Sequence, residues 1–259
     1  MTPILQTTLP FAPWMDPRTN RLPGVLPLEA DDWLRVDEAF AAQMAERDRL
    51  LAEIPDQVHA LLPQGVPAAT ELYGRVLARL ATVPGYAVGP DEVLRPDGVT
   101  VPLDASQPLL TLGRLVQEDL CLLEALGDEH VLTGANLCFP ASWTLAQKIG
   151  RPLSAIHIPV PSYDEGIMRR VQRMFDAIRP EQPLWRGNSL LYDDPTLFQP
   201  RLEGVPRPRP VERTYLRSER QCLLRLPETR AVVFTIHTYV LRRSDLEPEA
   251  EAAILALHP

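Results

Sequence analysis

The clearest hydrophobic pattern in the chain is a pair of apolar runs near the C-terminus. The sequence reads RQCLLRL at 220–226 and AVVFTIHTYVL at 231–241, with PETR between the two runs. β-branched and aromatic residues favour strands, and a short polar connection of this kind suits an antiparallel hairpin. We therefore predict a β-hairpin over these residues.

Apolar residues that recur every three or four positions predict helices elsewhere. The first helix is expected within 33–54, capped by Asp31 or Asp32, and the second within 68–82. An amphipathic helix is expected over 164–178 and a last helix over 245–258. The inward face of the first helix is expected to carry Trp33, Val36, Phe40 and Met44.

The remaining periodic stretches predict a sheet. Short strands are expected between 84 and 108 around the turn PDG, a strand over 129–139, and another over 188–194. Residues 118–124 look helical. No βαβ pattern, glycine-rich dinucleotide motif or P-loop is present, so helices around an antiparallel sheet, an α+β class, are expected.

Prolines divide the chain. Residues 1–30 are proline-rich and are expected to form an extended arm laid over a single α+β domain of residues 31–259. The passage from 136 to 163 is also rich in proline, and its SWTLAQK piece is expected to form about two helical turns with Ser142 as the N-cap. Residues 199–213 are expected to be a solvated Arg/Pro linker.

Composition removes several classes of function. The chain has 259 residues, 45% of them hydrophobic, and a net charge of −8, which argues against non-specific nucleic-acid binding. No apolar run approaches the length of a membrane-spanning helix, and the N-terminus lacks the pattern of a signal peptide, so we expect a cytoplasmic protein. Three cysteines without a CxxC motif argue against disulfides and a four-thiolate metal site.

Two of the five histidines lie inside apolar runs. A buried imidazole at His157 or His237 needs a hydrogen-bond partner or a metal, so each is either a functional residue or a satisfied core histidine. His59, His130 and His258 are interpreted as surface residues. No HxxxH or HxH spacing exists, so a multi-histidine zinc site has little support, whereas a haem needs only one axial imidazole.

Five further positions carry alternatives. Cys138 is a thiolate ligand or a small buried apolar residue. The adjacent carboxylates Glu118 and Asp119 contain a general base or an anchor for a cationic amine, or they begin a helix. Arg186 and Asn188, in the WRGN sequence, grip a carboxylate or form a turn.

Several motifs in order along the chain resemble the haem-dependent oxidative N-demethylase, alpha-subunit-like family. They are VQEDLCLL at 116–123, LCFPASW at 137–143, KIG at 148–150, IHIPVP at 156–161, RGN at 186–188, and RSERQCLLRLP with AVVFTIHTYV between 217 and 240. The resemblance extends from about Trp33 to Val240. It implies a PAS-like antiparallel sheet with flanking helices that encloses a haem pocket.

The resemblance also implies chemistry. It implies a b-type haem and the oxidation of a small secondary amine, such as dimethylamine, by O2. The electrons come from NADPH through separate components that carry FMN and a 2Fe–2S cluster. By position, His157 is the expected metal ligand of the haem, with Trp143 packed nearby and Lys148 and Arg186 facing the propionates.

Two positions depart from the family pattern. The last strand usually reads FTIRTY where this chain has His237, and the earlier motif usually reads RSNW where this chain has RGNS. These departures bear on the amine chemistry rather than on haem binding. His237 is expected to face the distal side of the pocket, as a hydrogen-bond donor or even a ligand, with Glu118 or Asp119 as acid, base or cation anchor.

Two other functions stay open from the sequence. One is a non-catalytic haem or gas sensor on the same PAS-like scaffold, since fold does not determine function. The other is an interaction protein without a cofactor, in which His157 is packed in the core.

Overall fold

The computed structural model describes residues 2–29, 31–156 and 165–257. In this part of the chain a seven-stranded antiparallel sheet runs in the order β1-β8-β9-β10-β6-β7-β2. Its strands are β1 (Leu26–Pro27), β2 (His59–Leu61), β6 (Asp119–Leu126), β7 (Glu129–Asn136), β8 (Leu184–Tyr192), β9 (Tyr215–Arg225) and β10 (Val232–Arg242).

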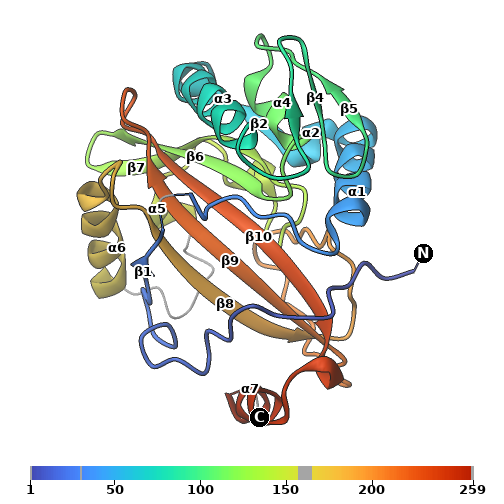
Figure 1. Cartoon of the computed structure of the whole chain (residues 1–259). Helices are drawn as coiled ribbons and strands as arrows, with labels where there is room; N and C mark the ends of the chain where they lie inside the picture. Colours follow the sequence, from blue (N-terminus) through green and yellow to red (C-terminus); the bar gives the residue numbers. More distant parts are fainter. Residues whose placement is uncertain (1, 30, 157–164, 258–259) are drawn as a thin grey trace.

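A second, three-stranded sheet and most of the helices surround the large sheet (Figure 1). The small sheet contains β3 (Ala87–Val88), β4 (Glu92–Leu94) and β5 (Thr100–Pro102). The helices are α1 (Phe40–Glu53), α2 (Pro55–Val58), α3 (Val66–Leu80), α4 (Pro108–Gly113), α5 (Leu153–Ile156), α6 (Glu165–Ala177) and α7 (Pro248–Leu257). Among the described residues no helix is long and apolar enough to cross a membrane.

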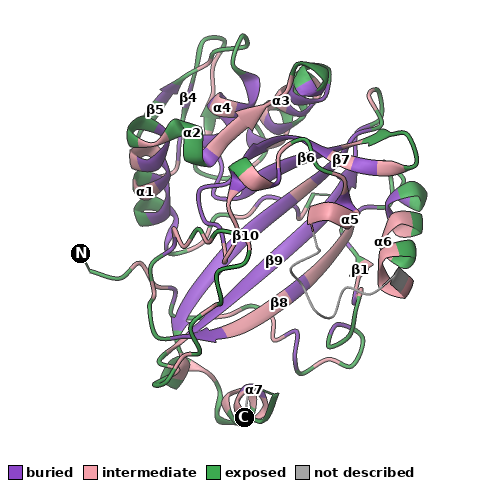
Figure 2. Ribbon diagram, turned by 180° about the vertical axis from the view of Figure 1, so that it is seen from behind, coloured by how far each residue is buried: buried purple, intermediate pink, exposed green. Residues whose placement is uncertain are grey.

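The large sheet is buried on both faces because alternate residues of its central strands enter different cores. Leu120 and Leu122 of β6 pack with Leu72 and Leu112 of the α3–α4 side. Cys121 and Leu123 point the other way, into a cluster that includes Phe175 of α6. Figure 2 shows α5 in front of this second face and most of β9 and β10 as buried.

The segment before α1 crosses the first face of the sheet (Figure 1). Gln6 pairs with Val240 of β10, its N–H donating to the Val240 carbonyl at 2.8 Å and its Oε1 accepting from the Val240 N–H at 2.9 Å. Phe11 meets the rings of Trp185 and Tyr239 edge-on, each at a centroid distance of 5.6 Å. β1 then pairs with β8 at the edge of the sheet.

Several sequence predictions are confirmed. The terminal hairpin is β9–β10, the short strands around PDG are β3, β4 and β5, and the amphipathic helix is α6, with Phe175 and Ile178 buried. The second predicted helix is α3. The α+β class is confirmed as a large antiparallel sheet with flanking helices.

Residues 118–124 are not helical, and the prediction of a helix there is wrong. They form the start of β6, a central strand whose side chains are buried on both faces, so its sequence reads as one apolar run without a period of two. As a strand, β6 lies between β10 and β7 in the sheet and is hydrogen-bonded to both.

The first helix starts later than predicted, at Phe40, so neither Asp31 nor Asp32 caps it; its N-cap position is Ala39, without a capping side-chain hydrogen bond. The Asp37 carboxylate accepts the N–H of Ala39 at 2.9 Å. Val36, expected on the buried face, is 41% exposed.

SWTLAQK contains one short 3₁₀ turn, Leu145–Gln147, instead of two helical turns. Ser142 has a positive φ of 67° and its N–H donates to the Gln199 carbonyl. Ser142 is therefore part of a connection to the 199–213 segment and not an N-cap.

Substitution of Gly187 tests the contact between the N-terminal segment and the sheet. An added Cβ would lie 2.8 Å from Phe11 Cε2 and 2.9 Å from Pro13 Cβ, so Gly187→Ala should destabilise the protein by about 1–3 kcal/mol through overpacking. Gly74→Ala is the control, because nothing lies within 4 Å of its added Cβ on α3, and it should be neutral or slightly stabilising. Urea denaturation of both variants measures the difference; equal midpoints would contradict the close contact.

Candidate functional site

A cavity of about 840 Å³ lies on the second face of the large sheet. Its walls are β6, β8, β9 and β10, helices α5 and α6, and residues 201–207 of the loop between β8 and β9. A volume of several hundred Å³ is typical of sites for cofactors and other small molecules.

Most of the cavity wall is apolar. α6 contributes apolar side chains to this wall, because residues three and four apart in a helix lie on the same face. The apolar lining includes Leu123, Leu132, Leu153, Ile156, Val171, Met174, Phe175, Leu223, Phe234 and Ile236. Such a wall excludes water and suits a large apolar ring system.

A polar patch interrupts this wall on β8 and β9. Arg186 and Asn188 alternate along β8, and Arg217, Glu219 and Gln221 alternate along β9, so all five side chains line the same cavity. Neighbouring strands thus place cations and a carboxylate together on a buried face.

Glu219 is the carboxylate in this patch and is 6% exposed. Its Oε2 accepts from Asn188 Nδ2 at 3.2 Å and from Gln221 Nε2 at 2.8 Å. The Nε of Arg217 lies 3.7 Å from its Oε1, while the other nitrogens of Arg217 donate to the carbonyls of Leu197 and Phe139. Glu219 is therefore a buried carboxylate held in place, with Oε1 free of hydrogen bonds from the neighbouring described residues.

The Nε of Arg186, like that of Arg217, is buried without a hydrogen-bond partner. Burial lowers the pKa of Arg186, although the negative charge of Glu219 opposes this shift. A buried guanidinium with an unused donor costs free energy unless another group pairs with it. Arg186 is thus suited to bind an anionic or polar ligand atom in the cavity.

The residues expected to hold a cofactor fall largely at this cavity. Trp143 and Lys148 line it together with Arg186. Lys148 Nζ already contacts Glu203 Oε1 at 2.5 Å and the Ile156 carbonyl at 2.6 Å. His157 lies outside the described residues, but its neighbour Ile156 lines the cavity.

His237, Glu118 and Asp119 do not line the cavity. His237 is on the opposite side of β10 from Phe234 and Ile236, so it faces the N-terminal segment rather than the pocket to which the sequence interpretation assigned it. Any role of these three residues in the chemistry of the cavity would have to act through the sheet.

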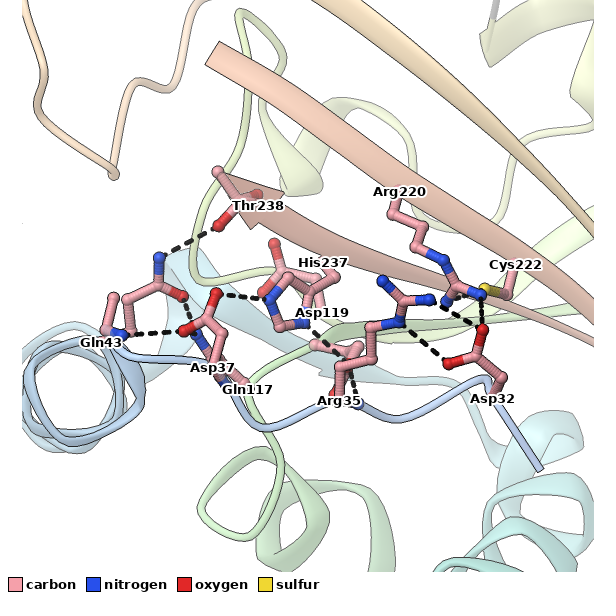
Figure 3. A network of polar contacts seen from close by, with 12 residues as sticks. Asp32, Arg35, Asp37, Gln43, Gln117, Asp119, Arg220, Cys222, His237 and Thr238 are labelled. Carbon is pink, nitrogen blue, oxygen red and sulfur yellow. Dashed lines mark hydrogen bonds and ion pairs between the residues drawn. The ribbon is translucent and has the colours of Figure 1, made fainter. Parts of the chain in front are cut away.

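His237 is instead the centre of a buried polar network (Figure 3). Its Nδ1 lies 2.8 Å from Glu118 Oε1 and its Nε2 lies 3.1 Å from Asp37 Oδ2. Both ring nitrogens therefore face carboxylates, which leaves no lone pair available for a metal in this arrangement.

The two carboxylates keep His237 protonated. Burial disfavours the imidazolium, but the hydrogen bonds to Asp37 and Glu118 outweigh this effect and raise the pKa of His237 to about 9. Although burial of Asp37 opposes the shift, its hydrogen bond to His237 lowers the pKa of that carboxyl group. Gln6 and Gln117 also donate to Asp37, which joins the network to the N-terminal segment.

Asp119 belongs to a separate buried ion pair. Its Oδ1 accepts from Arg47 at 2.7 Å, and both side chains are fully buried. The same carboxylate accepts the N–H groups of Cys138 and Phe139 at 2.7 and 3.0 Å. Burial raises the pKa of the Cys138 thiol to about 12, which disfavours a thiolate there.

Sequence reasoning missed Glu219 and Arg217 as cavity residues. The available signal was the alternation of Arg217 and Glu219 in RSER, directly before the predicted hairpin strand at 220–226, because alternate residues of a strand share one face. The contribution of residues 201–207 had no such signal. Among the described residues, no group of three or more potential metal ligands is present.

Comparison with known families gives one match. The model of the family described as haem-dependent oxidative N-demethylase, alpha subunit-like, matches residues 24–257 of this chain. The match includes every strand of the large sheet and every side chain that lines the cavity from Cys121 onward.

The charge of His237 predicts how stability changes with pH. Because its pKa is raised from 6.5 to about 9, its stabilisation is fully present below pH 6.5 and is lost as the pH rises through about 9. The loss should be about 3 kcal/mol, since each pKa unit corresponds to about 1.4 kcal/mol. Urea denaturation measures the free energy of unfolding of the wild type and of His237→Gln across this pH range. The difference between the two values should become smaller as the pH rises. A difference that does not change with pH would show that His237 is not an imidazolium.

Proposed function

Because the chain belongs to the haem-dependent oxidative N-demethylase, alpha subunit-like family, we propose that it binds a b-type haem in the cavity and oxidises an N-methyl group of a small secondary amine, such as dimethylamine, with O2. We also propose that the sheet with α5 and α6 is a PAS-like haem-binding unit. The observation that carries the proposal is the apolar cavity of about 840 Å³ with the unpartnered, buried Arg186 in its wall.

The residues of the cavity fit a haem. A macrocycle needs apolar walls, which α6 and the sheet provide, and its two propionates need cations. Lys148, Arg186, Arg201 and Arg207 line the cavity, and the last three form no ion pair with a described carboxylate. Trp143 lies in the same wall and would pack on the ring. His157, next to the cavity residue Ile156, is the proposed iron ligand.

Bound haem would supply the activation of O2, with electrons from NADPH arriving through separate components that carry FMN and a 2Fe–2S cluster. The reduction of O2 to water takes four electrons, of which the amine provides two and the partner provides two. The N-methyl amine is oxidised to an imine, water hydrolyses the imine to formaldehyde and the primary amine, and O2 is reduced to water. The chain itself must bind the amine, orient it and exclude bulk water.

Glu219 is the group best placed to bind the amine. A secondary amine is a cation at neutral pH, and a buried carboxylate attracts a cation more strongly than an exposed one does. Asn188 and Gln221 orient the Glu219 carboxylate and leave Oε1 towards the ligand.

Haem binding is tested by absorption spectroscopy. Protein expressed with a haem precursor should show a Soret band that shifts on reduction and again with carbon monoxide. His157→Ala should abolish stoichiometric haem uptake while the protein stays folded. The control is His59→Ala, since the His59 ring bonds Asn136 and does not line the cavity. An unchanged Soret band in His157→Ala would overturn the ligand assignment.

The role of Glu219 is tested by turnover. Glu219→Gln should retain haem but reduce kcat/KM for dimethylamine by about tenfold to hundredfold, because one charge-assisted hydrogen bond of about 1.5–3 kcal/mol is lost. Glu118→Gln is the matched control, since that carboxylate lies on the other face of the sheet. Equal loss in both variants would argue against Glu219 as the amine site. Haem binding without turnover of any amine would favour a sensor.

A further inference from the structure

The loop between β8 and β9, residues 199–213, exposes unusual apolar surface. Val211 is 82% exposed, Leu202 57% and Val205 53%. These are the three most exposed large apolar side chains in the part of the chain that the structure describes. Exposed apolar side chains gathered in one short segment are typical of an interaction surface.

The same loop is cationic in an acidic protein. Four arginines and two glutamates lie between 199 and 213, whereas the whole chain has a net charge of −8. Arg207, Arg209 and Arg213 line a surface groove of about 450 Å³ together with prolines of the loop. Charge complementarity therefore favours an acidic partner on this surface.

The backbone of the loop is held in place although its apolar side chains are exposed. Asp193 accepts the N–H groups of Val211 and Arg213, each at 2.6 Å. The Arg207 guanidinium lies 4.0 Å from the ring centre of Tyr192 and donates to the Leu191 carbonyl. Alternating prolines in PRPRP also fix φ. A preorganised surface loses little conformational entropy on binding.

The loop also forms part of the cavity wall. Arg201, Leu202, Val205 and Arg207 all line the cavity. A protein docked on residues 199–213 is therefore separated from a cofactor in the cavity only by the side chains of this loop. Electron transfer between proteins requires such a short separation between the two redox groups.

We propose that residues 199–213 are the docking surface for an acidic protein that donates one electron at a time. This inference rests on the proposed function, because the electron acceptor is the haem. In each encounter the reduced donor protein would lose one electron, and a haem bound in the cavity would accept it. The apolar residues Leu202, Val205 and Val211 contact the partner, and the arginines steer it.

The test uses haem-loaded full-length chain and, as the probe, a reduced plant-type 2Fe–2S ferredoxin, which is small and acidic. Arg209→Glu and Val211→Ser are chosen because neither residue lines the cavity. Stopped-flow absorbance should show that Arg209→Glu lowers the second-order rate of haem reduction about tenfold at low salt, with a smaller loss at high salt. Val211→Ser should lower the rate at both salt concentrations.

Arg75→Glu on α3 is the control, since it changes the net charge equally at an exposed position outside the loop. Unchanged rates in both loop variants, or an equal loss in the control, would overturn the proposal. Calorimetric titration of haem-free protein with the same ferredoxin is the second measurement. If no haem binds but Arg209→Glu still weakens the ferredoxin complex, the result supports the docking surface and contradicts the proposed haem function. If haem binds and dithionite reduces it while ferredoxin does not bind, only the surface fails.

Discussion

The structure depends on one constraint: the large sheet is buried on both faces, so every polar side chain that its central strands carry must find a partner inside the protein. β9 and β10 pair along their whole length, and each alternates between two cores. On the first face both ring nitrogens of His237 have carboxylate partners, Glu118 and Asp37. On the second face the Nε donors of Arg186 and Arg217 are buried without a hydrogen-bond partner. The difference between the two faces separates the structural network from the candidate site.

The fold was largely predictable where local pattern and tertiary environment agree. The hairpin and α6 have periodicities that match their burial, and they were placed correctly. Residues 118–124 were misassigned because a strand buried on both faces has no period of two. The start of α1 was misassigned because no side chain caps it: the N-cap position is Ala39, whose N–H donates to the Asp37 carboxylate.

The candidate site was predictable in part. Trp143, Lys148 and Arg186 reach one cavity from distant parts of the sequence, as the motif resemblance implied. The face on which His237 lies depends on strand register, which a histidine in an apolar run does not reveal. Glu219 was overlooked because alternating charges in a strand suggest a solvated edge, whereas β9 lies between two other strands.

The crossing of the N-terminal segment over β10 has a consequence for synthesis in the cell. Gln6 bonds Val240, a partner 234 residues later in the sequence, so the segment cannot reach its native position until the last strand has left the ribosome. Until then Phe11 and its neighbours, and the sheet face that they cover, are exposed to solvent or to chaperones. Contacts of such long sequence separation form slowly. The nascent chain is therefore prone to aggregate through this sheet face until β10 has been synthesised and the N-terminal segment has docked on it.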